Sequence, residues 1–265
     1  MEKRKMEKLG IETSLLGFGC MRFPVTAEGK IDEPLAEQMM DKAIASGVNY
    51  IDTAYPYHGG ESETFVGKVL KKYDRGSFYL ATKLPCWKVE KPEDIDAIFQ
   101  EQLEKLQTDY IDFYLVHALN KDRFQKIVEL GGIQRLEQLK DEGRIKNLGF
   151  SFHDDYDTFE KILCYRDWDF CQIQLNYMDV NEQAGLKGYR LTEEKNVPLV
   201  IMEPIKGGSL AAFADDITGM FGSLDPSASV ASFALRWVGS LPNVKVILSG
   251  MSTMEQVEDN LKTFG

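Results

Sequence analysis

The sequence predicts a parallel (β/α)8 barrel, or TIM barrel, with an N-terminal β-hairpin cap. Its 265 residues contain eight short apolar strands, each followed by a helical stretch, and this alternation is typical of a parallel sheet with right-handed crossovers. The length suits one barrel, and no linker rich in Pro, Gly or Ser divides the chain, so a single domain over 1–265 is expected. An open doubly wound sheet is the competing fold, but no G-x-G-x-x-G follows the first strand.

The elements follow in order along the chain. Residues 6–13 predict a short hairpin that covers the bottom of the barrel, and strand 15–19 precedes helix 33–46, in which apolar residues recur with helical spacing. The remaining predicted strand and helix pairs are 49–52 with 61–72, 78–82 with 93–106, 111–116 with 123–142, 146–150 with 155–164, 169–173 with 183–195, 198–202 with 227–239, and 244–248 with 253–262. The segment 203–226 is expected to be a long loop, and loops of that length usually carry function.

Composition and charge exclude several classes of protein. The net charge of −11 argues against broad nucleic-acid affinity and against binding to anionic membrane surfaces. No apolar run is long enough to span a bilayer, and the charged start lacks the apolar segment of a signal peptide, so a cytoplasmic protein is expected. The four cysteines and three histidines are scattered, which predicts reduced thiols and no metal site.

Three polar residues end three consecutive predicted strands. Asp52 follows VNYI, Lys83 follows SFYLAT, and His117 follows IDFYLV. Because parallel barrel strands end at one face and neighbouring strands lie about 4.8 Å apart, these side chains are expected to converge. Tyr57, five residues beyond Asp52, can reach the same group.

These residue types suggest acid–base chemistry. A free tyrosine has a pKa near 10, so Tyr57 needs help to exchange a proton near neutrality, and the ammonium of Lys83 is expected to lower its pKa. Asp52 would hold Lys83, and His117 would hydrogen-bond a carbonyl oxygen. Taken singly, each residue has an ordinary structural explanation, such as a helix cap or packing; together on consecutive strands they favour a reaction centre.

Longer motifs resemble the aldo-keto reductase superfamily over essentially the whole chain. They are GFGCMRFP (17–24), YIDTAYPYHGGESE (50–63), ATK (81–83), YLVH (114–117), GFSFH (149–153) and MEPIKGG (202–208). The resemblance implies a TIM barrel that binds a nicotinamide cofactor across its mouth and reduces an aldehyde or ketone. Tyr57 would then be the general acid, assisted by Lys83, Asp52 and His117.

The resemblance also implies a set of cofactor-binding residues. Ser151 and Gln172 would hold the nicotinamide carboxamide, and Met202 stands where relatives stack an aromatic ring. Residues expected near the diphosphate are Pro204, Lys206, Gly207 and Gly208, and those expected near the adenosine are Gly250, Ser252, Gln256 and Asn260. NADPH is the expected cofactor, but Gln256 stands where relatives have Arg, so NADH is the alternative.

The substrate is expected to be a hydrophobic or medium-sized carbonyl compound, held by Met21, Phe23, Tyr55 and Trp87. The stretches YHGGESE (57–63), FCQIQLNYMD (170–179) and LSGMSTMEQVEDNL (248–261) resemble a bacterial branch whose longer members carry a cysteine-rich, ferredoxin-like C-terminal tail. No such cluster occurs here, so this sequence cannot hold an iron–sulfur cluster. Two other functions stay open: a nucleotide-binding regulatory or redox-sensor subunit with little turnover, and an isomerase that works without nicotinamide.

Overall fold

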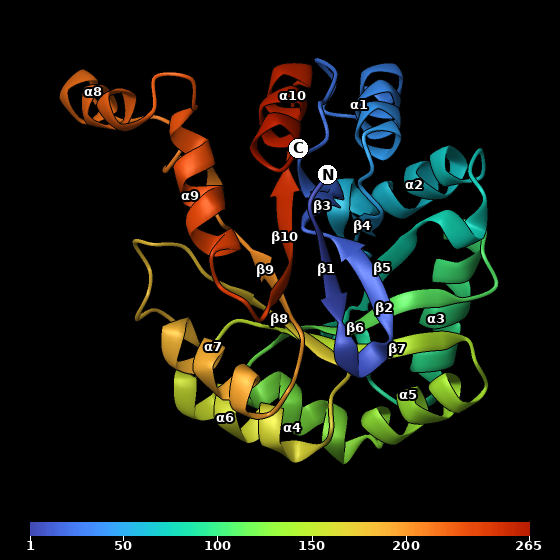
Figure 1. Ribbon diagram of the computed structural model, residues 1–265. Coiled ribbons are helices and arrows are strands. Elements are labelled where there is room, and N and C mark those ends of the chain that lie inside the picture. The colour runs from blue at the N-terminus through green and yellow to red at the C-terminus, as the bar shows by residue number, and fades with distance from the viewer.

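Eight parallel strands form a closed barrel in the computed structural model, which describes residues 1–265 (Figure 1). The strands are β3 (Leu16–Gly19), β4 (Tyr50–Asp52), β5 (Tyr79–Leu84), β6 (Ile111–Leu119), β7 (Ile145–Phe152), β8 (Phe170–Gln174), β9 (Leu199–Met202) and β10 (Val244–Gly250). They pair in chain order, and β10 pairs back to β3. This order is the one that successive right-handed crossovers produce, so the predicted TIM barrel is confirmed.

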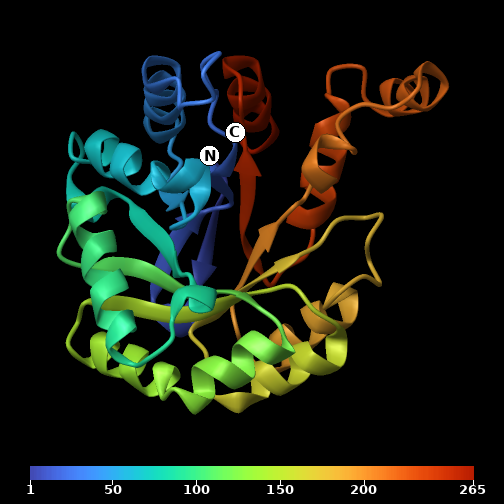
Figure 2. The ribbon, with the colours of Figure 1, turned by 180° about the vertical axis from the view of Figure 1, so that it is seen from behind.

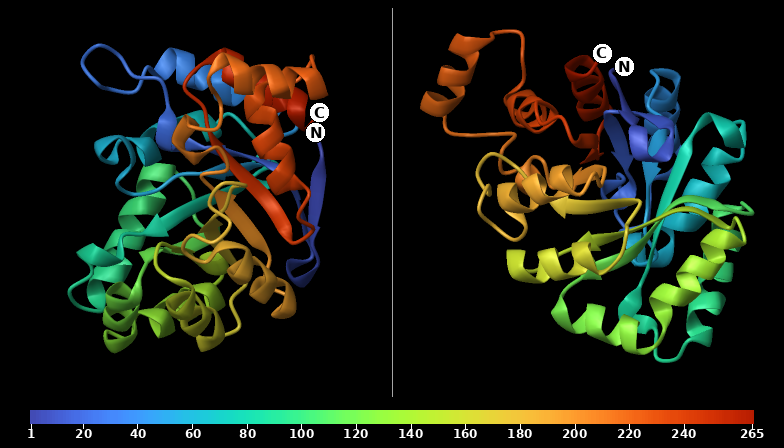
Figure 3. Two further views of the ribbon diagram at one scale, coloured as in Figure 1. Left: turned by 90° about the vertical axis from the view of Figure 1, so that its left-hand side faces the viewer. Right: turned by 60° about the horizontal axis from the view of Figure 1, so that its bottom comes forward.

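An antiparallel hairpin covers the N-terminal end of the barrel, as the sequence predicts. Strands β1 (Lys3–Met6) and β2 (Ile11–Ser14) pair, and Arg4 Nη1 donates to the carbonyl oxygen of Val244, the first residue of β10, at 3.3 Å. The hairpin extends further in both directions than the predicted 6–13. The chain ends lie side by side (Figure 3), where the Glu2 N–H donates to the carbonyl oxygen of Phe264 at 2.7 Å.

Ten α-helices accompany the strands. They are α1 (Glu33–Ala45), α2 (Ser62–Leu70), α3 (Glu93–Leu106), α4 (Lys121–Glu129), α5 (Gly132–Asp141), α6 (Tyr156–Tyr165), α7 (Gly185–Glu194), α8 (Asp215–Leu224), α9 (Val230–Gly239) and α10 (Met254–Thr263). None of them is both long and apolar enough to traverse a bilayer.

Two helix predictions were wrong. The single helix expected at 123–142 is broken into α4 and α5, because Gly131 adopts a left-handed conformation with φ 66°. The loop expected at 203–226 contains α8, which projects from the barrel (Figures 1 and 2). Its apolar residues Met220 and Leu224 are 69% and 77% exposed, while the ring of Phe221 packs against Phe233 of α9 with centroids 4.9 Å apart.

The lower part of the barrel interior is filled by side chains that point inward from alternate strand positions. They include Tyr50, Ala81, Phe113, Leu115, Phe170, Val200 and Val246. A larger apolar cluster lies between the strands and the surrounding helices. Because the bottom is packed, only the C-terminal end of the barrel has room for a ligand.

Candidate functional site

The inward register of the strands brings the predicted polar residues to one place. Successive strand residues face opposite sides, so a residue two positions after an interior one also faces the interior. Asp52, Lys83 and His117 each follow an interior residue (Tyr50, Ala81 and Leu115) by two positions. All three therefore point inward at the C-terminal ends of β4, β5 and β6.

Asp52 and Lys83 form a buried ion pair. Lys83 Nζ lies 2.7 Å from Asp52 Oδ1 and donates a second hydrogen bond to the Thr53 carbonyl oxygen at 2.7 Å. The Lys83 side chain is 0% exposed. Burial lowers the pKa of Lys83, but the negative charge of Asp52 and the Tyr57 hydroxyl outweigh it, so the pKa is raised overall and the ammonium stays charged.

Tyr57 lies next to this ammonium. The Tyr57 N–H donates to the Ala54 carbonyl oxygen at 3.1 Å, and the chain then reverses through His58, Gly59 and Gly60, all with positive φ. This turn places the Tyr57 ring centroid 5.3 Å from Lys83 Nζ. The structure thus brings together the phenol and the amine that the sequence analysis pairs.

The pKa of Tyr57 differs from the expectation. Desolvation is the largest effect and raises it, and the charge of Lys83 opposes this only in part, so the pKa lies above its ordinary value. The expected lowering of the pKa left out the burial of the phenol, which cannot be read from the spacing of residues in the sequence. A raised pKa keeps the hydroxyl protonated at neutral pH, which is the state that a proton donor needs.

The β6 strand is irregular next to His117. The pairing of β6 with β7 shifts between Val116 and Leu119, and Ala118 adopts a positive φ of 51°. The regular alternation of β6 therefore ends at His117. The His117 ring centroid lies 6.3 Å from that of Tyr57 and 5.2 Å from that of Trp87.

His117 is neutral in this environment. Burial lowers its pKa well below the ordinary value, and the nearby side chains of Lys83, His153 and Arg123 lower it further. Its Nδ1 atom is buried without a hydrogen-bond partner.

This depressed pKa predicts a pH-dependent stability. As pH falls below about 6.5, the unfolded chain binds a proton at His117 that the folded chain does not, so His117 lowers the free energy of unfolding by up to about 1.4 kcal/mol per pH unit. Urea unfolding between pH 7 and 5 should show a steeper loss for the wild type than for His117→Gln. If the free energy of unfolding fell equally with pH in the two proteins, the statement that His117 is neutral would be wrong.

A cavity of about 560 Å³ opens at this end of the barrel. Asp52, Tyr57 and His117 lie in its wall, while Lys83 is buried behind Asp52. Every residue that the family resemblance assigns to the cofactor also lines the cavity: Ser151, Gln172, Met202, Pro204, Lys206, Gly207, Gly208, Gly250, Ser252, Gln256 and Asn260. The cavity therefore joins the two predicted sets of residues.

Ser151 and Gln172 present groups that match a carboxamide. They are paired neighbours on β7 and β8. Ser151 Oγ accepts from the Ala118 N–H at 2.7 Å, which leaves its hydroxyl proton free to donate. Gln172 Oε1 is buried without a partner, and Gln172 Nε2 contacts Met202 Sδ at 3.4 Å. One free donor and one free acceptor fit the carbonyl and the amino group of a nicotinamide amide.

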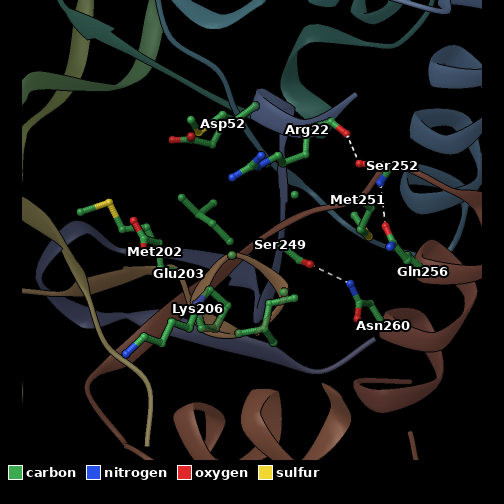
Figure 4. A pocket seen from close by; sticks show the side chains of 18 of the residues that line it. Arg22, Asp52, Met202, Glu203, Lys206, Ser249, Met251, Ser252, Gln256 and Asn260 are labelled. Carbon is green, nitrogen blue, oxygen red and sulfur yellow. Dashed lines mark hydrogen bonds between the residues drawn. The ribbon is translucent and has the colours of Figure 1, made fainter. Parts of the chain in front are cut away.

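The opposite end of the cavity is built by the β10–α10 turn (Figure 4). Thr253 caps α10 by accepting from the Gln256 N–H at 3.3 Å, and Gln256 Oε1 accepts from the Ser252 N–H at 2.7 Å. Asn260 Nδ2 donates to Ser249 Oγ at 2.8 Å. This reciprocal capping fixes the side chains of α10 that face the cavity.

Lys206 is less available to an anion than the sequence suggests. Its Nζ atom lies 2.5 Å from Asp179 Oδ1, and its side chain is 46% exposed. Gly207 and Gly208 both have positive φ, and a side chain at either would meet no atom within 4 Å. Glycine is used here for its backbone conformation and not for lack of space.

The structure places some of the predicted substrate residues near the cavity and directs others toward the helices. Of the four, only Met21 lines the cavity; Trp87 lies outside its lining, 38% exposed and beside His117. Phe23 is buried against Phe65, with ring centroids 5.0 Å apart, and the Tyr55 hydroxyl donates to Glu101 Oε2 at 3.1 Å. Neither of these two lines the cavity, because the turns after β3 and β4 direct them outward to helices.

Three charged residues of the cavity wall were missed as site residues: Arg22, Glu203 and Asp259. Arg22 directly follows the GFGCM stretch after β3, and Asp259 lies three residues after Gln256 on the same face of α10. The sequence positions of Arg22 and Asp259 could therefore have identified both as site residues. Glu203 lies inside the quoted motif MEPIKGG, between Met202 and Pro204, but its positive φ of 54°, which is a tertiary feature, could not be foreseen.

Fold and cavity together define the class: a TIM barrel with a ligand site at the C-terminal ends of its strands. The sequence model of the Aldo/keto reductase family matches residues 15–265, and the chain belongs to that family of oxidoreductases.

Individual relatives are similar to the chain at moderate identity. A probable aldo-keto reductase 1 of Glycine max is 34% identical over 56% of this chain and 44% of its own length. The NADH-specific methylglyoxal reductase of Escherichia coli is 25% identical over 97% of this chain and 89% of its own length. The solved aldo-keto reductase AKR11C1 from Bacillus halodurans, in its holo form, superimposes with a TM-score of 0.83 at 27% identity, over 99% of this chain and 90% of that one.

Proposed function

We propose that this protein reduces an aldehyde or ketone to an alcohol with a reduced nicotinamide dinucleotide, and that Tyr57 donates the proton. One observation carries the proposal. The Asp52–Lys83 ion pair, Tyr57 and His117 gather at the same end of the cavity as the carboxamide-matching pair Ser151 and Gln172. A reacting carbonyl group placed there would meet a proton donor and a nicotinamide ring together.

A bound reduced nicotinamide supplies the hydride that no side chain of this chain can supply. Tyr57 gives its hydroxyl proton to the carbonyl oxygen, and the phenolate left behind lies beside the ammonium of Lys83. Neutral His117 orients the carbonyl oxygen through a ring N–H. Asp52 keeps Lys83 charged and in place.

The remaining cavity residues would hold the dinucleotide. Ser151 and Gln172 would bind the carboxamide, and Met202 would pack against the ring. Arg22 would supply positive charge to the middle of the cavity, where the diphosphate would lie (Figure 4), whereas the ammonium of Lys206 is paired with Asp179. The β10–α10 turn would receive the adenosine.

The wall near Tyr57 suits a hydrophobic or medium-sized carbonyl compound. Met21 and Met202 line it, and Trp87 lies beside His117. The name of the Escherichia coli relative, a methylglyoxal reductase, supports a carbonyl substrate.

A fluorescence titration with NADH and NADPH, followed by turnover assays on a panel of aldehydes and ketones, tests this function. We expect saturable quenching by at least one nucleotide and carbonyl-dependent oxidation of that nucleotide. Binding without turnover on the whole panel would favour the regulatory or sensor alternative. Absence of binding to both nucleotides would overturn the proposal and leave an isomerase as the remaining enzyme hypothesis.

A further inference from the structure

Helix α10 presents no cationic side chain to its end of the cavity. The wall of this end consists of Ser252, Gln256, Asp259 and Asn260, joined by Ala231 from α9. Asp259 is the one charged residue among them, and its Oδ2 accepts from Ser229 Oγ at 2.5 Å. This end of the cavity is therefore neutral to negative.

The cationic side chains near this end of the cavity are directed away from it. Lys262 Nζ donates to the Ser227 carbonyl oxygen at 2.6 Å and does not line the cavity, and Arg236 pairs with Asp225 at 3.4 Å. Arg22 lines the cavity and its stem lies against Gly250, but its guanidinium extends toward Asp52 and away from Gln256 (Figure 4).

The position of the carboxamide-matching pair decides which part of a dinucleotide reaches α10. Ser151 and Gln172 lie with Tyr57 at the other end of the cavity, so a nicotinamide held by them leaves the adenosine ribose at the β10–α10 turn. NADH carries a hydroxyl group at the 2′ position of that ribose, whereas NADPH carries a phosphate group with up to two negative charges.

We propose that this chain prefers NADH to NADPH, and that Gln256 and Asp259 set the preference. The inference rests on the proposed function, because it requires a nicotinamide dinucleotide in the cavity. A 2′-phosphate would lie beside a carboxylate with no cation to balance it, and like charges at such close range disfavour binding. A 2′-hydroxyl is uncharged and finds hydrogen-bonding groups in Ser252 and in the Gln256 amide, whose Nε2 is not used by the helix cap.

Parallel fluorescence titrations of the full chain with NADH and NADPH at one ionic strength test the preference. The wild type is expected to bind NADH at least about tenfold more tightly. Gln256→Arg places a guanidinium at this end and should tighten NADPH binding by about tenfold, with less than about a twofold change for NADH. Asp259→Asn should shift the ratio in the same direction without adding a cation.

Gln38→Arg is the matched control. Gln38 is exposed on α1 and lies outside the cavity wall, so the same charge change there should leave the ratio of the two dissociation constants unaltered. Circular dichroism checks that each variant is folded. If Gln256→Arg does not fold, Asp259→Asn alone tests the role of the α10 end.

The outcomes separate this inference from the proposed function. Equal affinities, or tighter NADPH binding by the wild type, would overturn the NADH preference and leave the carbonyl reductase standing. A ratio that moves equally in Gln38→Arg and Gln256→Arg would show a general charge effect and overturn the role of Gln256. Loss of binding to both nucleotides in the wild type would instead remove the proposed function.

Discussion

Replacing Tyr57 by phenylalanine is expected to lower kcat by about a thousandfold while nucleotide binding stays within about twofold of the wild type. The change removes the hydroxyl of a ring that lies 5.3 Å from the buried ammonium and lines the cavity. The ring remains, so packing against His117 is kept. The measurement combines steady-state turnover of a carbonyl substrate with fluorescence titration of the nucleotide.

Tyr55→Phe is the matched control for this experiment. Tyr55 lies two residues earlier in the same loop, but its hydroxyl donates to Glu101 and the residue does not line the cavity. Its variant should retain turnover close to that of the wild type. If Tyr57→Phe kept more than about a tenth of the wild-type kcat, the proton-donor role would fail.

Replacing Lys83 by methionine should lower the free energy of unfolding by about 3–5 kcal/mol at pH 7 and also abolish turnover. The change leaves the carboxylate of Asp52 buried without its ammonium, and Asp52 Oδ2 already lacks a hydrogen-bond partner. Urea unfolding, monitored by circular dichroism, measures the loss.

The stability loss should shrink as pH falls. Burial already raises the pKa of Asp52 in the wild type, with Lys83 opposing this rise, and removal of Lys83 raises it further. The folded variant therefore takes up a proton at a higher pH than the unfolded chain, and this uptake stabilises the fold below the raised pKa. A difference between variant and wild type that stays constant from pH 8 to pH 5 would contradict this account.

Two further variants test whether the loss of stability comes from the unpaired, buried carboxylate. The double variant Asp52→Leu/Lys83→Met removes both charges and should recover more than half of the lost stability. Lys206→Met breaks an ion pair whose lysine is 46% exposed, so its effect should stay within about 1 kcal/mol. A Lys83→Met loss as small as that of Lys206→Met would mean that the buried pair contributes little.

The site residues were predictable to different degrees. Asp52, Lys83 and His117 could be found because each ends a strand, and the two-residue period of a strand fixes which side chains face inward. Phe23 and Tyr55 could not be placed in this way. They lie on turns beyond the strand ends, where no repeat determines direction, and helix packing draws them away from the cavity.

Helices were predictable where an apolar face is buried and less so elsewhere. The bounds of α3 agree with the predicted 93–106, because its apolar residues pack on the barrel. The predicted 123–142 was wrong because apolar spacing continues across the break, while the left-handed conformation of Gly131 ends the first helix. Helix α8 was missed because the glycine content of 203–226 suggested a loop and no buried face marks the helix.

The sequence by itself determined the barrel, the order of its strands and the three polar residues at their ends. The periods of strands and helices depend only on residues that are neighbours in the chain, so they can be read directly from the sequence. Only the tertiary structure decided the balance of burial and charge at Tyr57, the direction of Arg22, and the absence of a cation at the α10 end. These depend on distances between segments far apart in the chain, and on how much water their packing excludes, which no local pattern records.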